Sequence, residues 1–271
     1  MPRGVPVGAG VALRAHWPEY GIEAAGLGAF MLSACLFTTL LEHPASPVRQ
    51  ALPDAFLRRL PMGLAMGLTA VALIYSPWGR RSGAHFNPAT TLAFWRLGKV
   101  AGWDAAFYVL AQFLGGLAGV GLAAAILGAR VADPAVRFAA TTPGARGAVV
   151  AFAAELLMTF VLMTVVLTVS NRPGGARFTG VCAAALVAAY IVLEAPLSGM
   201  SLNPARTTGS AAWAGAWMAF WVYLAAPPLG MLLATEAYRR VPGLPPVRCA
   251  KLQHDATQRC IFRCGYAGAT R

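Results

Sequence analysis

Two stretches of the chain share three residues, and each begins a short apolar segment. They read Ser82-Gly83-Ala84-His85-Phe86-Asn87-Pro88-Ala89-Thr90 and Ser198-Gly199-Met200-Ser201-Leu202-Asn203-Pro204-Ala205-Arg206. Asn is a good helix N-cap and Pro suits the first helical position, so each Asn-Pro-Ala predicts a helix start. The segments 87–96 and 203–213 would extend about 15 Å, half of the roughly 30 Å hydrocarbon core. Two copies in matching hydrophobic halves predict a channel built from an inverted repeat.

The composition is that of a membrane protein. Hydrophobic residues make up 58% of the 271 residues and charged residues 12%, whereas soluble domains carry roughly 25% charged residues. Several apolar stretches are near or above the roughly 17–25 residues that a membrane-spanning helix needs: 21–41, 59–77, 104–128, 147–169, 178–195 and 214–236. The sequence predicts an all-α membrane protein with six transmembrane helices and two half-helices.

The basic residues lie beside these spans. A formal net charge of +12 would also suit nucleic-acid binding, but most Lys and Arg residues fall in segments that are cytoplasmic if both termini are inside. The positive-inside rule therefore favours cytoplasmic termini. We expect a multi-pass protein of the plasma (cell inner) membrane, surrounded by the lipid bilayer and without a nucleic-acid partner.

The halves of the channel region, about 20–128 and 147–238, match in several positions and are joined by a linker, 129–146. Each half has an acid near the start of its first span, and a Tyr followed seven residues later by a Gly: Glu23, Tyr108 and Gly115, then Glu155, Tyr223 and Gly230. Because each half has an odd number of spans, the second half inserts upside down, and the two Asn-Pro-Ala segments enter from opposite faces. Irregular backbone at membrane depth is tolerated only against protein or a wet cavity, so this arrangement predicts a pore.

The two ends of the chain are expected to lie outside the channel. Residues 1–19 have no apolar core followed by a cleavage site, which predicts a cytoplasmic N-terminal segment and a retained first span. The basic tail 239–271 is expected to be disordered. Its Cys249, Cys260 and Cys264 accompany His254 in a spacing that fits no established zinc pattern. A flexible thiol-bearing tail is the main expectation, with lipidation and metal binding as alternatives, and we assign no metal site and no cofactor.

Over about residues 20–238 the chain resembles the major intrinsic protein family, which comprises aquaporins and glycerol facilitators, and in particular its bacterial-type channels. The resemblance rests on both Asn-Pro-Ala motifs, the Ser-Gly-x-His-x-Asn-Pro-Ala run, the Arg after the second motif and the pattern of six spans. It implies a homotetramer in which each subunit has its own pore for water and small neutral solutes.

The resemblance assigns the pore centre to Asn87 and Asn203 and the outer constriction to Arg206. A water molecule would turn its oxygen toward both amides, so that the chain of hydrogen-bond donors reverses direction and opposes proton hopping. An arginine at membrane depth is expensive and by default suggests a function. Here it would donate hydrogen bonds to solute oxygens and repel cations.

Family spacing assigns the rest of the constriction to Met66, Ile191 and Met200; ordinary core packing is the alternative for Met66 and Ile191. Water-selective relatives commonly have His at the position of Ile191, and glycerol facilitators usually have Asp at the position of Thr207. The constriction would thus be unusually apolar. We expect water to pass together with other small uncharged solutes.

Three further residues, Glu23, His85 and Glu155, are expected to brace the loops that lead into the half-helices. Proton relay is the alternative for the two acids, and lining the inner vestibule is the alternative for His85. For the function as a whole, the alternatives to a water-conducting channel are a glycerol-, metalloid- or ammonia-type facilitator with poor water selectivity, a coupled secondary transporter, and a family member that conducts little. Coupling would need titratable groups at the pore centre. An enzyme is not expected, because the sequence contains no Gly-rich phosphate loop, paired-His metal motif or acidic dyad.

Overall fold

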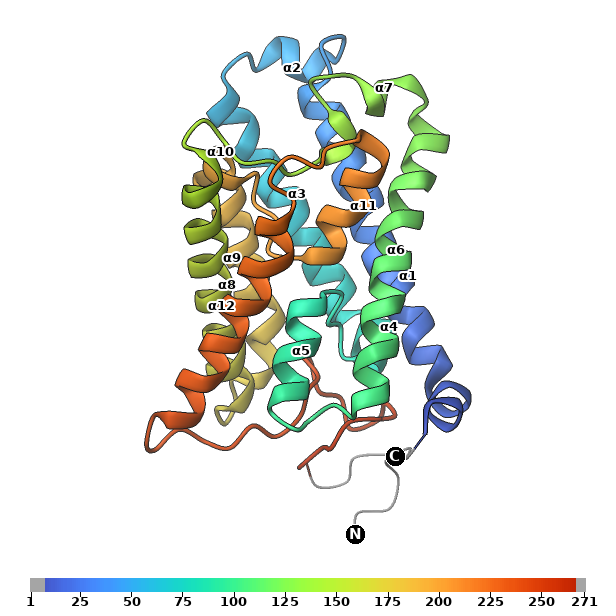
Figure 1. The fold of residues 1–271 in the computed structure, drawn as a ribbon, viewed down its shortest axis with the longest axis vertical. Helices are drawn as coiled ribbons and strands as arrows, with labels where there is room; N and C mark the ends of the chain where they lie inside the picture. Colours follow the sequence, from blue (N-terminus) through green and yellow to red (C-terminus); the bar gives the residue numbers. More distant parts are fainter. Residues whose placement is uncertain (1–7, 267–271) are drawn as a thin grey trace.

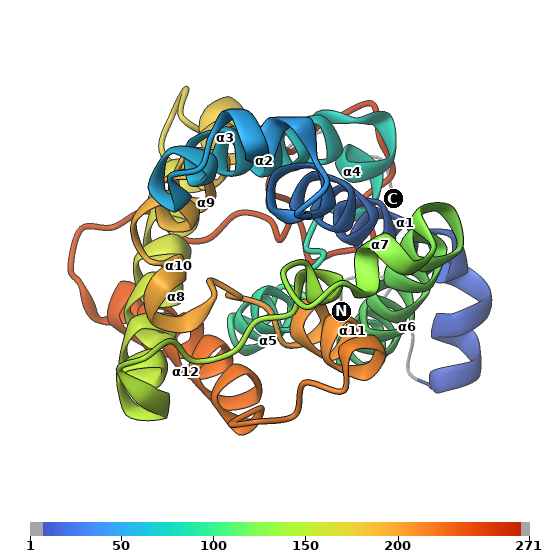
Figure 2. The ribbon, with the colours of Figure 1, turned by 90° about the horizontal axis from the view of Figure 1, so that it is seen from above.

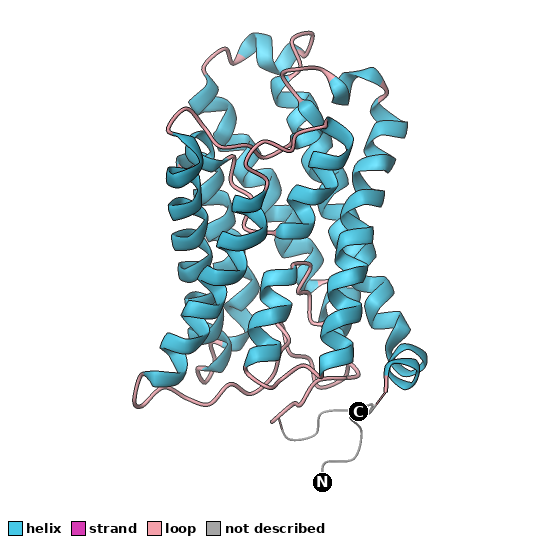
Figure 3. Cartoon of the chain, viewed as in Figure 1, coloured by secondary structure: helices cyan, strands magenta, loops and turns pink. Residues whose placement is uncertain are grey.

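The computed structural model describes residues 8–266, and these form a bundle of helices without β-strands in that range (Figures 1 and 3). The long helices are α1 (Ala9–Glu42), α3 (Ala55–Tyr75), α6 (Gly102–Leu127), α8 (Gly147–Asn171), α9 (Thr179–Leu193) and α12 (Trp221–Arg240). Two shorter helices, α5 (Pro88–Arg96) and α11 (Pro204–Ala214), lie among them. The connecting helices are α2 (Pro47–Ala51), α4 (Pro77–Ser82), α7 (Ala129–Ala132), η1 (Arg137–Ala139), η2 (Ala176–Phe178) and α10 (Ala195–Ser198). The predicted all-α fold is confirmed.

Five of the helical segments are long and apolar enough to cross a membrane: α1, α3, α6, α8, and α9 together with η2. The remaining long helix, α12, has 20 residues, and Pro227, Pro228 and its charged last turn lower its mean hydropathy. The predicted span 214–236 began too early, because Gly215 takes a left-handed conformation that ends α11. The bundle thus places a long helix at each of the predicted spans.

The first helix starts earlier than predicted. Residues 9–19, expected to be a segment outside the channel, form the first turns of α1, while residues 1–7 lie outside the described part of the chain. Two polar side chains at this end of the helix are buried against one acid: Asp104 on α6 lies 2.7 Å from the His16 ring nitrogen Nδ1 and accepts a 2.6 Å hydrogen bond from Tyr20. Such pairing lets the helix continue past the apolar stretch.

The two halves pack in the same way. In the first half α1 lies along α6, and in the second half α8 lies along α12. The repeated glycines sit at these contacts, where a Cβ on Gly115 would collide with the backbone of Ala24 and one on Gly230 with the backbone of Leu156. Helix α3 packs against α9 where the halves meet. Glycine at each of these contacts therefore permits the close approach of two backbones.

The half-helices α5 and α11 point in opposite directions from the middle of the bundle (Figure 1). We call the end that carries the start of α1 and the tail the terminal face, and the end that carries α2 and α7 the opposite face. Helix α5 runs toward the terminal face, where Arg96 pairs with Glu236 at 2.7 Å. Helix α11 runs toward the opposite face, where Trp213 packs near Phe138 of η1. Their N-terminal ends therefore meet in the interior.

The tail crosses the terminal face beneath the bundle (Figure 1). Residues 241–266 contain no helix or strand, yet they are fixed by backbone hydrogen bonds such as Leu252 N to Gly83 O at 3.1 Å and Arg263 N to Lys99 O at 2.9 Å. Apolar side chains of the tail, including those of Val247, Leu252 and Phe262, join the hydrophobic core. The expectation of a disordered tail from 239 to 271 differs from this arrangement: 239–240 end α12, 241–266 pack on the bundle, and 267–271 lie outside the described residues.

Candidate functional site

The loops before the two half-helices have the same unusual backbone. Positive φ angles occur at Gly83, Ala84 and Phe86 in the first loop, and at Gly199, Met200 and Leu202 in the second. Non-glycine residues adopt this region rarely and only when the surroundings hold them there. The chain therefore builds the same strained turn twice, each time directly before an Asn-Pro-Ala.

Two buried carboxylates hold these turns. Glu23 accepts hydrogen bonds from the backbone N–H groups of His85 and Phe86, at 3.1 and 2.6 Å. Glu155 does the same for Ser201 and Leu202, at 2.6 and 2.7 Å. Neither acid is exposed. Their position behind the loops is that of a brace, since each satisfies backbone donors that the turn leaves without helical partners.

Further side chains complete the brace in each half. Ser82 donates to Glu23 and Ser198 to Glu155, both at 2.7 Å, while Tyr108 donates to the carbonyl of Ser82 and Tyr223 to that of Ser198. In the sequence these tyrosines are only markers of the repeat. Gln112 donates to Glu23 at 2.8 Å and was not predicted as a site residue; a buried amide within an apolar span was the available signal.

The two motif asparagines cap their helices and bind the opposite half. The Oδ1 atom of Asn87 accepts from Ala89 N at 2.9 Å, and that of Asn203 from Ala205 N at 3.0 Å. The Nδ2 atom of Asn87 donates to Leu202 O, and that of Asn203 to Phe86 O, both at 2.8 Å. A carboxamide nitrogen carries two hydrogens, so each Asn keeps one N–H after this exchange.

Both asparagines open onto one cavity of about 380 Å³ that runs through the bundle interior. Every predicted constriction residue also lines it: Met66, Ile191, Met200 and Arg206. The lining includes Arg59 and Arg137 toward the opposite face, and His85 and Leu252 toward the terminal face. Most of the wall is apolar, and the described lining contains no carboxylate. The two asparagines, His85 and the predicted constriction residues therefore line a single cavity, whereas Glu23 and Glu155 do not line it.

Arg206 lies in the first turn of α11 with a free donor. Its backbone N–H is bound by the cap oxygen of Asn203 at 3.2 Å, and its side-chain Nη1 is buried without a hydrogen-bond partner among the described residues. A buried donor without a partner is costly, so a solute or water in the cavity is the natural acceptor. The neighbouring Thr207 instead bonds Thr141 of the linker at 2.7 Å and does not line the cavity.

His85 joins the first loop to the tail. Its Nε2 donates to the carbonyl of Ala250 at 2.8 Å, and its ring stacks between those of Phe94 and Phe262. The sequence predicted a bracing role for His85, but it gave no sign that the tail would supply the partners. The tail belongs to neither repeat, so its contacts have no counterpart in the second half.

Comparison with known proteins agrees with this architecture. The profile of the family described as "Major intrinsic protein" matches residues 25–238. A "Glycerol uptake facilitator protein-like 6" of Lactiplantibacillus plantarum is 36% identical over 65% of this chain and 82% of its own length. "Aquaporin NIP1-3" of Oryza sativa subsp. japonica is 37% identical over 66% of this chain and 60% of its own length.

A solved structure supports the fold alone. The X-ray structure of the aquaglyceroporin from Plasmodium falciparum superposes with a TM-score of 0.68 at 22% identity, and the match covers 83% of this chain and 96% of that one. The family profile spans most of the bundle, from α1 to α12. The chain is therefore a membrane protein that belongs to the major intrinsic protein family, whose members are channels.

Proposed function

We propose that the chain is a passive membrane channel for water and other small uncharged solutes, and that it excludes ions and protons. The observation that carries this proposal is the reciprocal pair of hydrogen bonds beside one cavity, in which Asn87 donates to Leu202 O and Asn203 donates to Phe86 O. It fixes the two helix starts against each other and leaves one N–H on each Asn for a passing solute.

The electrostatics of the passage support the exclusion of cations. The N-terminal ends of α5 and α11 carry partial positive charge and face each other at the centre. Arg206 adds a full charge, and no carboxylate is present in the described lining to offset it. A water oxygen accepts from both Asn donors, so its own hydrogens point away from the centre. The donor direction reverses there, which opposes proton hopping.

The apolar wall favours broad selectivity among neutral solutes. Met66, Ile191 and Met200 supply no hydrogen-bonding group beside Arg206 except backbone carbonyls, and they belong to the same hydrophobic cluster. A hydrocarbon backbone such as that of glycerol could pack against this wall while its hydroxyls meet Arg206 and the asparagines. The relative named as a glycerol uptake facilitator is consistent with this second candidate, a facilitator with poor water selectivity.

We further propose that the terminal face is cytoplasmic, that the protein lies in the plasma membrane, and that it assembles as a homotetramer. The orientation is supported by basic residues at the terminal face, which include Arg80, Arg81, Arg96 and Lys99 together with those of the tail. The tetramer is supported only by the family to which the chain belongs.

Stopped-flow swelling of proteoliposomes tests the proposal. Water and glycerol flux should exceed that of empty liposomes, rise linearly with the solute gradient, and be independent of a pH gradient. The double variant Asn87→Asp/Asn203→Asp, reconstituted in equal amount, serves as the comparison because it retains both cap oxygens but loses the donors. Saturable or proton-driven uptake would instead indicate a coupled transporter.

A further inference from the structure

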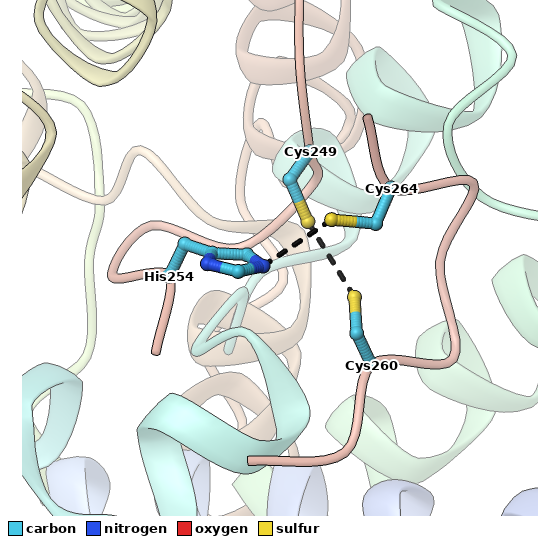
Figure 4. A group of neighbouring side chains, drawn as sticks. All are labelled: Cys249, His254, Cys260 and Cys264. Carbon is cyan, nitrogen blue, oxygen red and sulfur yellow. Dashed lines mark hydrogen bonds between the residues drawn. The ribbon is translucent and has the colours of Figure 1, made fainter. Parts of the chain in front are cut away.

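Four potential metal ligands converge in the tail at the terminal face (Figure 4). They are Cys249, His254, Cys260 and Cys264, and one ligand atom from each lies within 4.8 Å of all the others. The Cys249 and Cys260 sulfurs are 3.6 Å apart, and the Cys264 sulfur lies 3.2 Å from Nε2 of His254. The four side chains point toward a common centre, although their backbone segments arrive from different directions.

These distances fit a tetrahedral ion. With Zn–S bonds near 2.3 Å and a Zn–N bond near 2.0 Å, tetrahedral geometry places two sulfurs about 3.8 Å apart and a sulfur about 3.5 Å from the nitrogen. We propose that Cys249, His254, Cys260 and Cys264 form a structural zinc site that holds the tail across the terminal face. The site would act independently of which solute the pore conducts.

The surroundings suit a buried thiolate centre. Cys249 and Cys260 are almost fully buried, whereas His254 and Cys264 are half-buried and leave a path for the ion. Three thiolates and one neutral imidazole around Zn²⁺ leave one net negative charge. Lys251, itself buried, donates from Nζ to the carbonyl of Arg259 at 2.6 Å, one residue before the Cys260 ligand, and forms no ion pair with a carboxylate among residues 8–266. It therefore supplies the compensating charge that such a centre needs.

The ligand chemistry selects zinc among the common ions. Thiolates and imidazole are soft or borderline ligands that disfavour Mg²⁺ and Ca²⁺. A closed set of four protein ligands without an open position is the form of a structural zinc site. The thiols bind as thiolates, so metal binding releases their protons to solvent.

An aromatic contact orients one of the four ligands. The ring of Tyr266 stacks on the imidazole of His254 with the ring centroids 4.2 Å apart.

A metal cross-link would add to the hydrogen bonds and apolar contacts that hold the tail on the bundle. Residues 241–266 have no regular secondary structure, and an irregular segment of this length gains little stability from its own backbone. The four ligands divide it into short loops, with spacing Cys-x4-His-x5-Cys-x3-Cys. One ion would fix Ala250 and Leu252, which lie between the first two ligands and contact His85 and Gly83.

Metal analysis of the full chain tests the site. Untagged protein is purified in detergent under reducing conditions, incubated with a small excess of zinc, desalted, and assayed by mass spectrometry for metals. We expect about one zinc per chain in the wild type and in Cys182→Ser, a matched control whose thiol lies on α9. The variants Cys249→Ser/Cys260→Ser and His254→Gln should lose most of this zinc. Equal zinc in the wild type and the double variant overturns the proposal, as does stoichiometric copper in place of zinc.

Two further measurements separate a specific site from folding effects. Cobalt added to the metal-free wild type should give the visible absorption of tetrahedral Co²⁺ and a thiolate-to-cobalt band, both absent from Cys249→Ser/Cys260→Ser. Trypsin should cut after Arg259 and Arg263 roughly tenfold faster once a chelator has removed the metal, because local opening then exposes the tail. The helical circular dichroism should stay constant. A cleavage rate that is the same with and without the chelator overturns the proposed role of the site.

Discussion

The side-chain amide of Asn203 donates a 2.8 Å hydrogen bond to the carbonyl oxygen of Phe86, 117 residues away in the other half of the chain. Asn87 makes the equivalent bond to Leu202. Each asparagine thus has three roles: its side-chain oxygen caps its own helix, one N–H binds the backbone of the opposite loop, and the other N–H is left for a solute.

Replacing Asn203 by Asp separates these roles. The Asp oxygen can still cap α11, but it cannot donate to Phe86 O, and an ionised carboxylate would face a buried carbonyl. We expect the midpoint of thermal unfolding in detergent to fall, with a loss of about 1–3 kcal/mol for the unpaired buried group. Cation leak through proteoliposomes should rise. Asn203→Ala is the comparison, since it removes the cap as well; equal behaviour of wild type and Asn203→Asp would contradict the assignment.

Arg206 is expected to control charge exclusion. Arg206→Val should leave folding largely intact, widen the passage and admit cations or protons, because the guanidinium that lines the cavity at the first turn of α11 is removed. Decay of a pH gradient in proteoliposomes measures this, with Arg130→Ala on α7, outside the cavity lining, as control. Wild-type rates of decay in Arg206→Val would remove the residue from its proposed role.

Ile191 is expected to set the range of solutes. Ile191→His restores a hydrogen-bonding group beside Arg206 and narrows the passage, so glycerol flux should fall relative to water flux. The matched control is Ile191→Leu, which conserves volume and apolarity. An unchanged ratio of glycerol to water flux in Ile191→His would show that Ile191 does not contribute to selection.

Glu155 is expected to matter for assembly rather than for conduction. Glu155→Gln replaces one carboxylate oxygen by an N–H₂ group that faces the backbone donors of Ser201 and Leu202. Hydrogen bonds to a charged group contribute about 1.5–3 kcal/mol each, so we expect a marked loss of thermal stability and of folded yield. Glu236→Gln, at the partly exposed pair with Arg96, is the control and should have a small effect. A Glu155→Gln protein with wild-type stability would argue against the brace.

Leu252 lines the cavity from the tail and is expected to narrow its terminal mouth. Leu252→Ala should speed solute flux. The control Leu244→Ala changes a leucine of the same segment that packs on the core without lining the cavity. Slower or equal flux in Leu252→Ala would mean that the tail does not limit permeation.

The sequence predicted the elements that occur twice. Asn-Pro-Ala, the buried glutamates and the Tyr-to-Gly spacing are local patterns with a direct physical meaning, so they placed the half-helices within a residue or two of α5 and α11. Those patterns also predicted to which of the two repeats each of these residues belongs. The roles of the site residues in transport stay predictions until the fluxes are measured.

The elements that occur once could not be predicted in this way. The position of the tail depends on contacts with Gly83, His85 and Lys99, which are far away in sequence. The gap between α11 and α12 depends on a left-handed Gly215 that ends α11 and that periodicity does not show, and α12 begins only at Trp221. The four tail ligands have irregular spacing, because loops rather than one helix or hairpin bring them together.

The exchange of amide bonds also sets an order for biogenesis. While only the first half has been synthesised, Asn87 has no carbonyl from Leu202, and Phe86 has no donor from Asn203. These hydrogen bonds can form only after the second half has inserted, when both half-helices, α5 and α11, are in the membrane. An N-terminal fragment should therefore lack the hydrogen bonds that join the two loops at the centre of the bundle. Supplying the second half as a separate polypeptide should restore a conducting channel.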